Sequence, residues 1–230
     1  MADKASRGLV VYGDGLMPLI DTPHLHSLAS KASCGFLSLP ESEVERVVRE
    51  LAQLFDAHDR SLSERFMGMR AAIFTLGFHV LQFDQLASEL LRFLGFQEGE
   101  VSEASEFDLV FVHIWVNALI GGVMQIAQPC SEVGSRLHFS LVMSYGTVSE
   151  TNSFFSMLRP SQSFTMKGGN IRHHSPMLIA QWQEAVTRRD MAETFSFKEF
   201  VEYGANLAIP ADRFLHEVAF KLWKAPKYGA

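Results

Sequence analysis

The sequence has few cysteines and no long apolar run, and each shortage excludes a class of protein. Its 230 residues include two cysteines, Cys34 and Cys130, which are too few for a disulfide framework or a cysteine-based zinc site and indicate a reducing compartment. No stretch reaches the roughly 18 apolar residues of a membrane-spanning helix. The first residues also lack the apolar centre of a signal peptide. We therefore expect a cytoplasmic protein without a membrane span, with the nucleus as the alternative location.

The charge balance excludes a class of partner. The formal charge is −6 at pH 7, whereas nucleic-acid-binding proteins carry basic patches or stripes, so we expect no nucleic-acid partner. Hydrophobic residues make up 47% of the chain, at the upper end of the ordinary range. This length suits one substantial core, and we predict a single α/β domain over residues 1–230. The apolar surplus favours a protein partner or a homo-oligomer.

Short apolar runs alternate with amphipathic segments along the chain. We expect strands at residues 9–12, 34–39, 69–78, 107–114, 137–144 and 176–182. We expect helices at residues 22–32, 40–59, 83–96, 195–204 and 210–224, and a further buried helix in the second half of residues 110–127. This alternation predicts a three-layer α/β fold, in which a mostly parallel sheet carries helices on both faces. Residues 98–106 and 149–170 are expected to be surface connections.

Residues typical of helix ends mark two of these helices. Asp84 is expected to cap the helix at residues 83–96, and Gly95 to end it. Ser196 and Glu199 have the spacing of a capping box, in which each side chain accepts a hydrogen bond from the other residue's backbone N–H.

Four stretches, taken in order, resemble one family. The opening "VVYGDGL" with "TPHLHSLASKASCGFLSL" resembles the start of the archaeal-type cofactor-independent phosphoglycerate mutases, which belong to the alkaline phosphatase superfamily. "FDLVFVHI" is similar to the family's strand before a metal-binding loop, and "RHHSPMLIA" to a later segment and strand. The segment from "FSFKEFVEYG" to the final "KYGA" looks like the family's tail. The resemblance implies an alkaline-phosphatase-like core, although residues 40–105 are much shorter than in the family.

The resemblance also implies a metal site. Enzymes of this superfamily hold two divalent metals with Asp and His side chains and use a Ser or Thr nucleophile. Asp14 matches the first aspartate ligand, and His173 and His174 lie near the last ligand position. Asp14 can also be interpreted as a turn residue between two glycines, and the two histidines as polar residues satisfied locally. Asp14, His173 and His174 are the predicted remnant metal positions.

The other parts of the family's catalytic apparatus are missing from the sequence. Ser42 lies where the nucleophile is expected, but without the glycine and the Asp-Thr pair that accompany it. "WVNALIGG" replaces a loop that carries an acid and a histidine, and "SYGT" replaces an Asp-His pair. The G-x-S-x-G and phosphate-loop motifs are also absent. We therefore predict no catalytic residue, no cofactor-binding residue and no cofactor.

Three functions stay open. The first is a non-catalytic alkaline-phosphatase-like protein that acts as a protein-binding or scaffolding subunit. The second is a residual metal-dependent phosphatase or phosphoglycerate-mutase-like enzyme. The third is a small-molecule binding module that uses the strand ends. Residues 61–97 are rich in large apolar side chains, including Phe93, and these either pack on the sheet or form an exposed contact patch.

Overall fold

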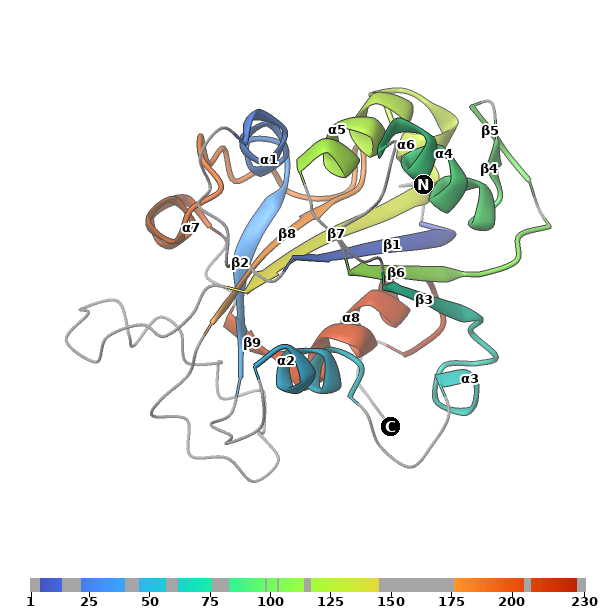
Figure 1. Cartoon of the computed structure of the whole chain (residues 1–230), viewed down its shortest axis with the longest axis horizontal. Helices are drawn as coiled ribbons and strands as arrows, with labels where there is room; N and C mark the ends of the chain where they lie inside the picture. The colour runs from blue at the N-terminus through green and yellow to red at the C-terminus, as the bar shows by residue number, and fades with distance from the viewer. Residues whose placement is uncertain are drawn as a thin grey trace.

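A computed structural model describes most of the chain (Figure 1). The described residues are 5–13, 22–39, 46–56, 62–75, 83–97, 99–102, 104–113, 117–144, 176–204 and 208–226.

The strands are β1 (Arg7–Gly13), β2 (Ser33–Ser38), β3 (Ala71–Thr75), β4 (Phe96–Gln97), β5 (Glu100–Val101), β6 (Leu109–His113), β7 (Leu137–Ser144), β8 (Met177–Trp182) and β9 (Ala208–Pro210). The helices are α1 (Pro23–Ala29), α2 (Arg46–Leu54), α3 (Leu62–Arg65), α4 (Phe83–Phe93), α5 (Asn117–Ile126), α6 (Glu132–Arg136), α7 (Phe197–Tyr203), α8 (Phe214–Lys221) and the 3-10 helix η2 (Ala211–Arg213).

Seven strands form one sheet in the order β3-β6-β1-β7-β8-β2-β9. Each neighbouring pair is parallel except the two pairs that involve β8, which runs antiparallel to β7 and to β2. The four strands predicted around residues 9–12, 107–114, 137–144 and 176–182 are therefore confirmed as members of one mostly parallel sheet. The central strand is β7. Its neighbour β1 lies between β6 and β7, and Tyr12 of β1 is in register with His113 of β6 and Val142 of β7.

Helices cover both faces of the sheet, as predicted. Side chains of β1 alternate between the two faces, so that Leu9 and Val11 point to one face while Val10 and Tyr12 point to the other. The first face, here called the α1 face, packs against α1, α4, α5, α6 and α7. The second, the α8 face, packs against α2, α8 and the turn after α3. Figure 1 shows these two layers above and below the sheet. None of the helices in the described ranges is long and apolar enough to cross a membrane.

The predicted helix ends are confirmed only in part. The Ser196 hydroxyl accepts the Glu199 N–H at 3.3 Å, but the Glu199 carboxylate accepts the N–H of Glu193 at 2.9 Å, so only the serine half of the capping box is seen. Helix α4 begins at Phe83, so Asp84 lies inside its first turn rather than before it. Gly95 ends this helix as predicted, with a φ of +82° that favours glycine.

The apolar segment at residues 61–97 contributes mainly to the two cores. Among its described residues, the large apolar side chains that are buried are Phe66, Met69, Leu90, Leu91, Leu94 and Phe96. Phe93 is half-buried, and its ring stacks on Phe74 with 5.2 Å between ring centroids. Met67 and Ile73 are 62% and 53% exposed. Of the two alternatives, packing on the sheet is the one seen for Phe93, because this half-buried side chain packs against the α1-face core.

Candidate functional site

The carboxyl ends of the parallel strands lie at one edge of the sheet, where ligands bind in open α/β proteins. Strands β1, β6 and β7 are adjacent and end there at Gly13, His113 and Ser144. Strand β8 runs in the opposite direction, so its first residue, Met177, pairs with Ser144 at the same edge. Functional side chains are therefore expected along this edge.

A buried carboxylate lies beneath the edge. Glu50 of α2 is 1% exposed, and each of its oxygens accepts one hydroxyl. Tyr12 donates to Oε2 at 2.5 Å, and Ser144 donates to Oε1 at 2.9 Å. Tyr12 reaches α2 because alternate residues of β1 point to the α8 face. These three side chains join helix α2 to the ends of β1 and β7.

The Tyr12 ring also contacts His113, whose ring centroid lies 5.1 Å away. We call Tyr12, Glu50, His113 and Ser144 the Glu50 site. A buried carboxylate without hydrogen bonds costs several kcal/mol, so the two hydroxyls help to stabilise Glu50 at this position. The site can therefore hold α2 on the sheet and present a histidine at the edge.

The predicted metal residues Asp14, His173 and His174 lie outside the described residues, and so does Ser42. Their described neighbours in sequence are Gly13, at the end of β1, and Pro176, just before β8. The register places β7 between these strands, so their ends are separated by about 10 Å, which is two strand spacings. The prediction that these residues are remnant metal positions stays a prediction.

The segment that replaces the family's metal-binding loop has a structural role. Helix α5 begins at Asn117, whose Oδ1 accepts the backbone N–H groups of His24 at 3.2 Å and Leu25 at 3.3 Å. These donors lie in the first turn of α1, where backbone N–H groups lack partners within the helix. A Cβ at Gly121 would lie 2.8 Å from the His24 ring. "WVNALIGG" therefore contains the residues that let α5 pack closely on α1.

Within the described ranges, no three His, Cys, Asp or Glu side chains gather closely enough to hold a metal ion. Glu50 is accompanied by two hydroxyls and a histidine rather than by a second acid. A metal site with three such ligands would thus need at least one ligand from outside the described ranges, such as Asp14, His173 or His174.

A second buried polar group lies further along the same side of β7. His138 Nε2 is 3.3 Å from the Ser140 hydroxyl and 3.4 Å from the Gln181 amide nitrogen. Complete burial, together with the charge of Lys221, lowers the pKa of His138 to about 3. The imidazole is therefore neutral at physiological pH, and it serves as a buried hydrogen-bonding group.

Sequence reasoning missed the Glu50 site, although the sequence contains a signal for it. Glu50 has helical spacing with Val47, Leu51 and Leu54, which places an acid on the apolar face of α2. Ser144 shares a face of β7 with His138 and Ser140 because the three are an even number of residues apart. Polar residues that recur on a buried face are the pattern that points to such a network.

Comparisons with known proteins bear on the fold. No protein-family model matches the chain, and no curated protein matches it. The solved structure of the PH0037 protein from Pyrococcus horikoshii is similar over 100% of both chains, with a TM-score of 0.58 and 12% sequence identity. This likeness shows a shared fold alone. Arguments about function must therefore rest on the residues of this chain.

Proposed function

We propose that the chain is a non-catalytic protein of the alkaline-phosphatase-like type that acts as a protein-binding or scaffolding subunit. The proposal rests on the sequence resemblance for its family and on the described residues for the loss of activity. The observation that carries it is the contact of Asn117 with the first turn of α1. Where the resembled enzymes place a metal-binding acid and histidine, this chain has a helix start that stabilises its own packing.

The Glu50 site supports the same reading. Glu50 lies at the carboxyl edge, but both of its oxygens already accept hydroxyls from the sheet. Breaking either hydrogen bond would leave part of a buried carboxylate poorly satisfied. Glu50, a buried acid among the described residues of this edge, thus serves the packing of α2 on the sheet rather than acting as a free ligand or base.

One observation favours the alternative of a residual metal-dependent phosphatase or mutase-like enzyme. Gly13, which precedes Asp14, and Pro176, two residues after His174, border the same edge of the sheet. Two metals in such an enzyme must be held by several acids and histidines from different loops. The alternative therefore requires Asp14 and at least one of His173 and His174 to act together.

Purifying the protein from the cells that produce it naturally tests the proposal. The full-length chain, tagged and purified without chelators, is expected to recover a protein partner in a fixed molar ratio and to carry no stoichiometric manganese or zinc. The matched control is the Asp14→Ala, His173→Ala, His174→Ala variant, which is expected to recover the same partner in the same ratio. About two metals per native chain, with none on the variant, would contradict the proposal.

A further inference from the structure

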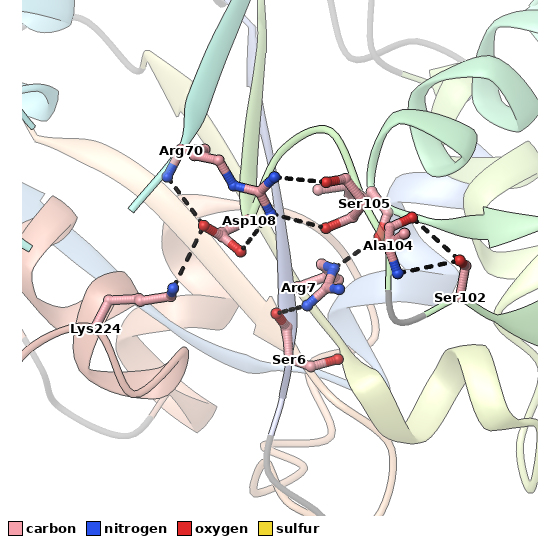
Figure 2. Close-up of polar contacts among 9 residues, drawn as sticks. Ser6, Arg7, Arg70, Ser102, Ala104, Ser105, Asp108 and Lys224 are labelled. Carbon is pink, nitrogen blue, oxygen red and sulfur yellow. Dashed lines mark hydrogen bonds and ion pairs between the residues drawn. The ribbon is translucent and has the colours of Figure 1, made fainter. Parts of the chain in front are cut away.

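We draw no further inference here: the strongest candidate, the cluster of Arg7, Arg70 and Lys224 around the buried Asp108 at the amino ends of the parallel strands (Figure 2), carries nothing, because residues 98–106, which Arg70 contacts through Ser105, contain four glutamates that offset its positive charge, and nothing in the structure shows which anion would occupy it.

Discussion

The Tyr12 phenol donates a 2.5 Å hydrogen bond to the Glu50 carboxylate and so connects the inner strand β1 to helix α2. Both side chains are buried, and 38 residues of sequence separate them. A second hydroxyl, from Ser144, holds the other carboxylate oxygen. The chain thus carries a polar network at the edge where related folds bind ligands, and this network is directed into the protein.

Replacing Glu50 by alanine removes the acceptor of both hydroxyls and leaves a cavity between α2 and the sheet. We expect the free energy of unfolding to fall by about 2–4 kcal/mol, since hydrogen bonds to charged groups contribute about 1.5–3 kcal/mol each. Urea denaturation measures the change. The matched control is Glu202→Ala on the exposed side of α7, which is expected to change stability by less than about 0.5 kcal/mol. Equal effects of the two substitutions would show that Glu50 does not stabilise the fold.

Tyr12→Phe tests one bond of this network while keeping the ring and its contact with His113. The expected loss of unfolding free energy is about 1–3 kcal/mol, less than for Glu50→Ala, because the Ser144 hydroxyl still binds the carboxylate. In a double-mutant cycle with Glu50→Ala, the two losses should be less than additive. Strict additivity would mean that the two side chains do not interact.

The two cysteines should differ in reactivity. Burial, aided by the nearby Asp190 carboxylate, raises the pKa of Cys34 to about 12, and thiols react as thiolates. Cys130 is exposed. Iodoacetamide at pH 8 is therefore expected to add one label to the native chain, at Cys130, and two labels after unfolding. Mass spectrometry of the intact and digested protein counts and places them. Rapid labelling of Cys34 in the native protein would contradict its burial.

The buried His138 predicts a pH dependence of stability. Burial holds its pKa at about 3 in the folded chain, whereas an unfolded histidine has a pKa of about 6.5. The unfolded chain therefore binds the extra proton between these values, and stability falls as the pH falls from 6.5 towards 3. The contribution amounts to about 2 kcal/mol between pH 7 and pH 5.

The His138→Gln variant should lose this part of the slope when urea unfolding is repeated at pH 7, 6 and 5. An NMR titration of the His138 ring gives an independent check, because the folded protein should show no protonation down to pH 5. A midpoint near 6.5 in that titration would show that the ring is not buried as the structure places it.

The sheet could be predicted from sequence because its strands are apolar on both faces. Leu9, Val10 and Val11 form a continuous run, which is the pattern of a strand covered by helices on both sides. The short strand β9 could not be predicted, since its three residues include Pro210 and take their conformation from pairing with β2. The hairpin of β4 and β5 was not predicted, since residues 98–106 were expected to be a polar surface connection. Ser102 donates its N–H to the Gly95 carbonyl, and this contact across the ends of the hairpin brings β5 beside β4.

The candidate site was harder to predict than the fold. The Glu50 and Ser144 side chains meet across 94 residues of sequence, so their contact depends on the order of strands in the sheet. Asn117 is a second example, because the two residues of α1 whose N–H groups it accepts are 92 and 93 positions away in sequence. Glu199 shows that even a local contact is not decided by spacing, because its spacing to Ser196 predicts a reciprocal cap while its carboxylate accepts the Glu193 N–H at 2.9 Å. Spacing identifies the residues that can form such contacts, and packing selects the partner.

The central claim is that this chain does not catalyse phosphoryl transfer, and turnover of phosphate esters measures it most directly. The full-length chain is incubated with p-nitrophenyl phosphate, and separately with phosphoglycerate, at saturating manganese. Product formation is compared with that of the variant carrying Asp14→Ala, His173→Ala and His174→Ala. The account predicts that the two proteins form product at the same rate, and that this rate equals that of a control with buffer and manganese but no protein. A manganese-dependent rate that the variant loses would contradict it, since Asp14, His173 and His174 would then act as metal ligands in an active enzyme.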